Sequence, residues 1–167
     1  MIDFSKITTL IFDVDGVLTD GTVQAYATGE QVRTFYIKDG YALDRAVKAG
    51  YNVAIISGGL EIGVKKRLEF LGVKDIFMNV KNKVESFQAY IKDKNIDPAT
   101  VLYMGDDIPD IKISNLVGIS TCPNDACVDV KENAKFVSPF NGGHGAVRDI
   151  IEKVMRSQGK WTIGEWL

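Results

Sequence analysis

A chain of 167 residues, with 46% hydrophobic and 25% charged residues, has the composition of a soluble globular domain with a substantial core. Its net charge of −2 excludes a general electrostatic attraction for nucleic acid or an anionic membrane. We find no apolar run of membrane-spanning length and no signal-peptide pattern, so we expect a cytoplasmic location with Cys122 and Cys127 reduced.

The predicted elements alternate between strands and helices along the chain. We expect strands at 7–12, 51–56, 75–78, 100–104, 117–120 and 135–137, and helices at about 40–50, 64–72, 83–94 and 145–157. A turn at 27–30 predicts a small β-hairpin insertion at about 22–37. Such alternation indicates an α/β fold of three layers, a central parallel sheet covered by helices on both faces. No segment is long enough for a separate cap domain.

Two acidic sequences directly follow predicted buried strands, DVDGV at 13–17 and GDDIPD at 105–110. The carboxyl ends of parallel strands meet at one edge of the sheet, where ligands bind. Carboxylates gathered there would repel one another and raise one another's pKa unless a cation lay among them. Oxygen ligands of this kind suit Mg²⁺, so we predict a magnesium site rather than a purely structural acidic turn.

Two further positions can bind an anion. Ser57, followed by Gly58 and Gly59, ends the second strand, and a hydroxyl beside free N–H groups can hold a phosphate. The same sequence is also an ordinary turn. Lys83 begins a predicted helix, where a cation opposes the helix dipole, so a role in anion binding is a candidate. Taken alone, a solvated lysine beside Lys81 is the better interpretation, and only the acidic strand ends and Ser57 favour anion binding.

These strand ends together resemble the haloacid dehalogenase (HAD) superfamily of aspartate-nucleophile phosphatases, which has a Rossmann-like fold. The resemblance extends to a capless branch through residues 35–41, 64–73 and 142–149. That branch contains the 3-deoxy-D-manno-octulosonate 8-phosphate (KDO 8-P) phosphatases and relatives that act on nine-carbon sialic-type sugar phosphates. It implies one domain over 1–167, with a C-terminal tail from about 140 to 167.

The resemblance implies a mechanism. Asp13 attacks phosphorus and forms an aspartyl-phosphate, while Asp15 protonates the leaving sugar oxygen and then activates water. Ser57 and Lys83 bind the transferring phosphoryl group. Mg²⁺ is held by the Asp13 carboxylate, the Asp15 backbone carbonyl and Asp106. The resemblance therefore implies a Mg²⁺-dependent phosphoric monoester hydrolase.

Five residues are predicted to bind the substrate. Arg67 and Lys38 are the charged candidates for the sugar carboxylate, because an arginine can hold a carboxylate at two points. Asp39 and Gly40 lie in the segment that resembles the branch's substrate segment, and Gly58 belongs to the phosphate loop. Asp110 is expected to orient Lys83 or the waters of the metal. For His144 two roles stay open, a contact with the substrate and packing at the start of a helix.

The resemblance also implies a homotetramer. In this branch the hairpins of four subunits pack into a central barrel-like structure, and each active site is covered by a neighbour. Here the hairpin at about 22–37 and the glycine-rich segment at 142–145 would make those contacts. An unpaired hairpin edge favours association over a mere surface decoration.

The sequence differs from the other members of the branch at two positions that are expected to bind the sugar acid. Leu60 and Asp44 stand where many members have arginines. We therefore predict hydrolysis of KDO 8-P in lipopolysaccharide precursor synthesis, with a nine-carbon keto-acid sugar 9-phosphate as the alternative substrate. A third reading is a non-catalytic tetrameric assembly module.

Overall fold

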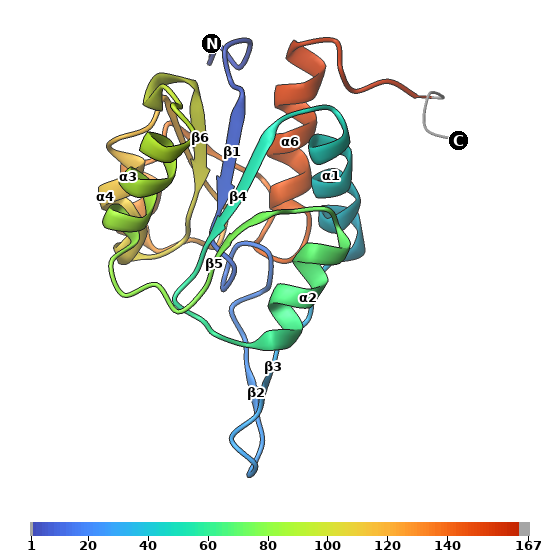
Figure 1. The fold of residues 1–167 in the computed structure, drawn as a ribbon, viewed down its shortest axis with the longest axis vertical. Coiled ribbons are helices and arrows are strands. Elements are labelled where there is room, and N and C mark those ends of the chain that lie inside the picture. The colour runs from blue at the N-terminus through green and yellow to red at the C-terminus, as the bar shows by residue number, and fades with distance from the viewer. Residues whose placement is uncertain (1, 164–167) are drawn as a thin grey trace.

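Six short apolar segments of the chain form a parallel sheet at the centre of the molecule. The structure, a computed structural model, describes residues 2–163. The strands are β1 (Thr9–Phe12), β4 (Asn52–Ile56), β5 (Asp75–Phe77), β6 (Val101–Met104), β7 (Ile119–Cys122) and β8 (Phe136–Val137). Their order across the sheet is β5-β4-β1-β6-β7-β8, and every neighbouring pair is parallel (Figure 1). The central strand β1 therefore lies between the strands that carry the predicted phosphate loop and the second acidic cluster.

Helices cover both faces of this sheet. They are α1 (Ile37–Lys48), α2 (Ile62–Phe70), α3 (Lys83–Asp93), α4 (Ile111–Ser114), α5 (Val128–Asn133) and α6 (Ala146–Ser157). In β1, Leu10 and Phe12 pack in one apolar cluster with α1, α2 and α6, while Ile11 packs in a second cluster with α3 and α4. Successive strand residues point to opposite faces, so both faces of the sheet are buried. The predicted three-layer α/β fold is confirmed.

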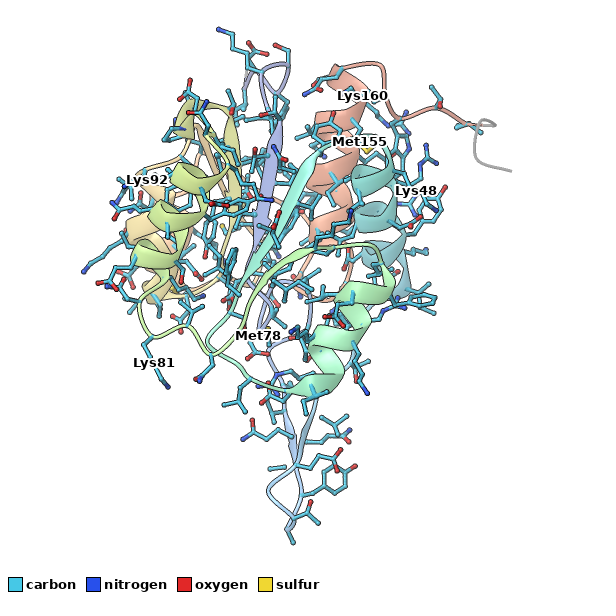
Figure 2. The ribbon with its side chains drawn as sticks, in the orientation of Figure 1. Lys48, Met78, Lys81, Lys92, Met155 and Lys160 are labelled. Carbon is cyan, nitrogen blue, oxygen red and sulfur yellow. The ribbon has the colours of Figure 1, made fainter. Side chains whose placement is uncertain are left out.

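The exposed faces of the helices carry charged side chains. Lys48 on α1 and Lys92 on α3 are exposed and point away from the sheet (Figure 2). None of the helices within residues 2–163 has both the length and the apolar character to cross a membrane. Lys48 and Lys92 thus mark the solvent-facing sides of α1 and α3.

The segment between β1 and α1 forms the predicted hairpin, which projects beyond the end of the sheet (Figure 1). Its strands β2 (Gln24–Ala25) and β3 (Gln31–Val32) are antiparallel and only two residues long. All residues from 21 to 32 are exposed. The hairpin strands end at Val32 rather than near Ile37, and α1 begins at Ile37 rather than near Gly40. In the first turn of α1, Ile37 and Lys38 are exposed while Asp39 and Gly40 are buried.

The predicted C-terminal tail is largely part of the core. Helix α6 buries six apolar side chains against the sheet and α1, so the chain from 146 to 157 is a core element. Beyond it, the ring of Trp161 lies 6.2 Å from that of Tyr41 and 5.5 Å from the guanidinium of Arg148. The chain after α6 therefore folds back on its own subunit as far as Thr162, whose carbonyl accepts from Arg45, and residues 164–167 of the predicted tail lie outside the described residues.

Candidate active site

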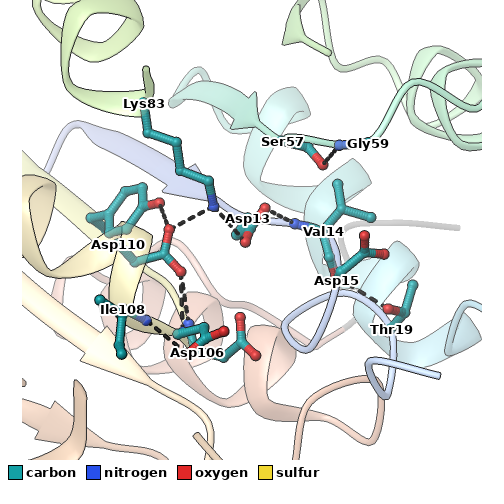
Figure 3. Close-up of polar contacts among 12 residues, drawn as sticks. Asp13, Val14, Asp15, Thr19, Ser57, Gly59, Lys83, Asp106, Ile108 and Asp110 are labelled. Atoms are coloured by element: carbon teal, nitrogen blue, oxygen red, sulfur yellow. Dashed lines mark hydrogen bonds and ion pairs between the residues drawn. The ribbon is translucent and has the colours of Figure 1, made fainter. Parts of the chain in front are cut away.

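The ends of the three central strands bring the predicted catalytic residues to one place. Phe12, the last residue of β1, is in register with Ile55 of β4 and Met104 of β6. Asp13 continues this ladder, and its N–H donates to the carbonyl of Met104 at 3.0 Å. Asp13, Ser57 and Asp106 thus follow neighbouring strands at one edge, as the parallel topology predicts (Figure 3).

Lys83 links two of the carboxylates. Its Nζ lies 2.6 Å from Oδ2 of Asp13 and 2.7 Å from Oδ1 of Asp110, and only 11% of the side chain is exposed (Figure 3). Burial alone would lower the pKa of Lys83, but the two carboxylates outweigh it and raise this pKa. The lysine is therefore a fixed cation at the sheet edge.

Asp110 is a buried carboxylate that organises the second acidic cluster. Its Oδ1 accepts from Lys83 and from the hydroxyl of Tyr103, at 2.7 and 2.5 Å, and its Oδ2 accepts from the backbone N–H groups of Asp106 and Asp107, at 3.1 and 3.3 Å. Four donors satisfy this buried charge. Burial and the charge of Asp110 raise the pKa of Tyr103 well above its usual value, so this hydroxyl stays a donor. Sequence reasoning missed Tyr103, because a tyrosine within a buried strand looks like core.

The acidic residues form a cluster suited to a divalent cation. One carboxylate oxygen each from Asp13, Asp106 and Asp110 lies within 4.8 Å of the others. Burial, followed by the charges of Asp13 and Asp110, raises the pKa of Asp106 to about 7, and burial raises that of Asp13 to about 6 against the opposing effect of Lys83. A cation among these oxygens would relieve the repulsion that raises the pKa values.

Gly16 allows the two acidic loops to approach each other. Its φ is +78°, and a Cβ at this position would lie 2.0 Å from Oδ2 of Asp106. Only glycine fits such an approach. The side chain of Asp15 is not part of the cluster of three carboxylates, where Asp110 stands instead. The predicted ligand at Asp15 is its backbone carbonyl, and that assignment stays a prediction.

The loop after β4 lies beside these residues. Ser57 is buried, and its Oγ accepts from the N–H of Gly59 at 3.1 Å. Gly58 is exposed and lines, with Lys83 and Lys112, a cavity of about 580 Å³. Gly58 and Lys83 thus share one cavity wall, as expected for a loop and a lysine that bind the same anion.

The carboxylate of Asp15 is held by Arg33, a residue that sequence reasoning missed. Nε of Arg33 lies 2.5 Å from Oδ1 of Asp15, and Nη2 lies 3.1 Å from Oδ2. Nη1 of Arg33 lies 3.0 Å from Oε1 of Glu61. Arg33 follows the hairpin strand β3, and neither spacing nor periodicity connects it with Asp15, so no local signal could have found it.

Asp39 and Gly40 contact α6 and α2, and no contact among residues 2–163 joins them to the carboxylate cluster. Asp39 is buried, and its two oxygens accept the N–H groups of Gly145 and Arg148, at 3.2 and 2.8 Å. Burial raises the pKa of Asp39 to about 6. The carboxylate satisfies N–H groups at the start of α6. Gly40 is buried beside Arg67, whose Nη2 would lie 2.7 Å from a Cβ there. Their substrate-binding roles stay predictions, and Asp39 has a structural role that the sequence did not reveal.

The remaining candidates lie around α1, α2 and α6. The guanidinium of Arg67 is 5.8 Å from the ring of Phe70, on α2. Lys38 is exposed and lines a cavity of about 640 Å³ with His144 and Arg148. The structure does not join Lys38 or Arg67 to the carboxylate cluster by any contact among the described residues, so their roles stay predictions.

The glycine-rich segment before α6 packs on its own subunit. A Cβ at Gly142 would lie 1.8 Å from the carbonyl oxygen of Gly16, in the first acidic loop. The exposed ring of His144 stacks on Tyr36 at 6.3 Å, and its Nδ1 lies 2.9 Å from the carbonyl of Gly142. This segment therefore borders the site of its own chain.

Comparison with known proteins gives a consistent result. Residues 70–151 match the model of the haloacid dehalogenase-like hydrolases. The 3-deoxy-D-manno-octulosonate 8-phosphate phosphatase of Escherichia coli K12 is 35% identical over 155 residues, which cover 93% of this chain and 82% of that protein. The crystal structure of the phosphatase of this name from Yersinia pestis has a TM-score of 0.92 and 30% identity, over 95% of this chain and 85% of that one.

A third comparison includes bound ligands. The 3-deoxy-D-manno-octulosonate 8-phosphate phosphatase of Moraxella catarrhalis, in complex with a magnesium ion, a phosphate ion and KDO, has a TM-score of 0.90 and 28% identity. The match covers 94% of this chain and 90% of that one. The similarity therefore extends over nearly the whole length of both proteins.

Proposed function

This chain belongs to the haloacid dehalogenase-like family of 3-deoxy-D-manno-octulosonate 8-phosphate phosphatases, and we propose that it hydrolyses KDO 8-P to KDO and phosphate through an aspartyl-phosphate on Asp13. The observation that carries this proposal is the joint position of Asp13, Lys83 and Asp106 at one sheet edge. A nucleophile, a cation and a further carboxylate are what phosphoryl transfer to an aspartate requires.

In the first step, Oδ of Asp13 attacks phosphorus, and the bond from phosphorus to the C8 oxygen of the sugar breaks. Asp15, in its protonated form, gives its proton to the leaving oxygen, so that an alcohol rather than an alkoxide departs. Lys83 and Ser57 bind phosphoryl oxygens. The Lys83 ammonium also lies against Asp13 and reduces the repulsion between the carboxylate and the phosphate.

In the second step, a water attacks the phosphorus of the aspartyl-phosphate. The Asp15 carboxylate takes the proton of that water, the bond between phosphorus and the Asp13 oxygen breaks, and the Asp13 carboxylate is regenerated with inorganic phosphate as product. Asp15 is then protonated again, ready for the next first step.

Magnesium is the proposed cofactor, because the raised pKa values of Asp13 and Asp106 mark a carboxylate cluster that lacks enough positive charge of its own. The Asp13 carboxylate, the Asp106 carboxylate and the Asp15 backbone carbonyl would hold it, with Asp110 beside them. When bound, Mg²⁺ supplies positive charge to the phosphoryl oxygens and orients them for in-line attack.

The substrate is tested by measuring phosphate release, with Mg²⁺, from KDO 8-P and from a nine-carbon keto-acid sugar 9-phosphate side by side. A clear preference in kcat/KM for the eight-carbon substrate supports the proposal and a role in lipopolysaccharide precursor synthesis, in the cytoplasm. Preference for the nine-carbon substrate assigns the alternative. If Mg²⁺-saturated protein hydrolyses neither sugar phosphate nor an aryl phosphate, the result supports the hypothesis of a non-catalytic assembly module.

We further propose a homotetramer built through the hairpins. Val23 and Tyr26, on either side of β2, and Val32 in β3 are large hydrophobic side chains that are exposed, at 41%, 52% and 38%. Burying them between subunits would remove an apolar surface from water. Sedimentation equilibrium of the full chain, compared with a Val23→Ser/Tyr26→Ser variant, tests this: a tetramer that dissociates in the variant is expected, and a monomeric wild type would contradict it.

A further inference from the structure

Arg33 joins the hairpin to the catalytic machinery. Residues 21–32 are all exposed, whereas Arg33, the first residue after β3, has only 6% of its side chain exposed. A guanidinium this deeply covered has lost most of its water and needs anionic partners. It has two, Asp15 and Glu61, which lie on different loops.

The contact with Asp15 is a two-point ion pair. Nε and Nη2 of Arg33 each meet a different oxygen of Asp15, at 2.5 and 3.1 Å. Such a pair defines the plane of the carboxylate as well as its position, which a lysine cannot do. Of the Asp15 side chain, 39% is exposed, and no other partner of its carboxylate is found within residues 2–163. Arg33 is therefore what orients this carboxylate.

Arg33 is itself held in place. Its Nη1 lies 3.0 Å from Oε1 of Glu61, and Oε2 of Glu61 accepts the N–H of Leu60 at 3.1 Å. Glu61 directly precedes α2, on the loop that begins with Ser57. The Asp15 loop, the end of the hairpin and the Ser57 loop are thus joined by a single guanidinium.

We propose that Arg33 is a positioning residue, whose two-point ion pair holds the Asp15 carboxylate in the orientation that proton transfer to and from the reacting oxygens requires. This inference rests on the acid–base role proposed above for Asp15. A carboxylate offers about four lone-pair sites, and Arg33 takes one on each oxygen. A site on each oxygen remains to carry the proton while the two hydrogen bonds from Arg33 persist. The hairpin, through Arg33, sets the geometry of the catalytic acid.

The experiment uses two substrates that differ in their need for an acid. When KDO 8-P is cleaved, the leaving sugar oxygen departs as an unstable alkoxide unless an acid protonates it. The leaving group of 4-nitrophenyl phosphate is a stable phenolate, which departs without protonation. We compare kcat/KM, which reports on phosphoryl transfer to Asp13 and is not affected by the later hydrolysis of the common intermediate. The variants are Arg33→Gln, Arg33→Lys and Asp15→Asn in the full chain with Mg²⁺.

Arg33→Gln is expected to lower kcat/KM for KDO 8-P by about 10- to 100-fold and that for the aryl phosphate by less than about 3-fold. Arg33→Lys keeps the charge but not the two-point contact, so it should recover only part of the loss. Equal losses on both substrates, or no loss on either, would overturn the proposal.

Arg156→Gln is the matched control. Arg156 also pairs with a carboxylate through Nε and Nη2, which both lie against one oxygen, Oε1 of Glu152, at 2.9 and 2.6 Å, and Arg156 is exposed. Its removal should leave both rates unchanged. Thermal unfolding reports whether each variant is folded. If Arg33→Gln does not fold, Glu61→Gln is the alternative variant. It keeps Arg33 and Asp15 but removes the charge of the second carboxylate that holds Arg33, so kcat/KM for KDO 8-P should again fall selectively, by a smaller factor.

The variants distinguish a failure of the positioning role of Arg33 from a failure of the acid–base role of Asp15. If Asp15→Asn loses the sugar phosphate selectively and Arg33→Gln does not, the acid–base role stands and the positioning role of Arg33 is wrong. If Asp15→Asn shows no selective loss, the proposed acid–base role itself is wrong.

Discussion

The ammonium of Lys83 lies 2.6 Å from Oδ2 of Asp13, and this contact joins the start of α3 to the end of β1 across the sheet edge. A lysine at the first position of a helix opposes the helix dipole. The second ion pair, with Asp110 at 2.7 Å, compensates that cost. The pair places a cation at the carboxylate that must approach an anionic phosphate.

Asp13→Asn should abolish turnover, because an amide is a poor nucleophile and cannot form the acyl phosphate. We expect phosphate release to fall by at least about 10³-fold. The fold should persist, since Lys83 keeps its pairing with Asp110. Asp93→Asn, an exposed substitution at the end of α3, is the control. Circular dichroism with a phosphate-release assay makes the measurement, and substantial residual turnover would refute the nucleophile assignment.

Asp106→Asn should weaken Mg²⁺ binding, since it removes a charged oxygen from the cluster of three carboxylates. We expect the Kd for Mg²⁺ to rise at least about 10-fold in a calorimetric titration. Asp107→Asn is the comparison, because Asp107 is exposed and its carboxylate accepts the N–H of Ile108 outside that cluster. An Asp106 variant that titrates like the wild type would contradict the ligand assignment.

Tyr103→Phe should slow turnover without touching any predicted ligand of the substrate. The Tyr103 hydroxyl donates to Oδ1 of Asp110, the atom that also holds Lys83. Its loss leaves a buried charge short of one donor and should cost about 1–3 kcal/mol of unfolding free energy. We expect kcat to fall about 3- to 10-fold. Tyr90→Phe, which removes a hydroxyl bonded to Asp75 remote from the site, should leave kcat unchanged.

Asp39 should make the stability depend on pH. Burial raises its pKa from 3.8 to about 6 in the folded protein. Between these values the unfolded chain holds fewer protons at this group than the folded one, so its contribution to stability is present below pH about 4 and is lost as pH rises to about 6. The difference in unfolding free energy between wild type and Asp39→Asn should therefore fall by on the order of 3 kcal/mol over that range. Urea unfolding at pH 4 and pH 7 measures it; a constant difference would contradict the burial effect.

Much of the fold was predictable because its signals are local. Apolar runs that end at Asp13, Ser57 and Asp106, alternating with helical periods, specify a parallel sheet whose carboxyl ends meet. Lys83 was found for the same reason, as the first residue of a helix that follows a strand. The short helices α4 and α5 were missed, since four and six residues carry too little periodicity.

The sequence by itself determined the class of chemistry, because the acidic and phosphate-binding residues stand at fixed places relative to the strand ends. Only the tertiary structure decided which residues hold that chemistry in place. Arg33 returns from an exposed hairpin to Asp15, Tyr103 points from a strand at Asp110, and Asp39 supports the start of α6. These contacts join segments whose separation along the chain follows no period, and burial fixes them only once the helices and strands have packed.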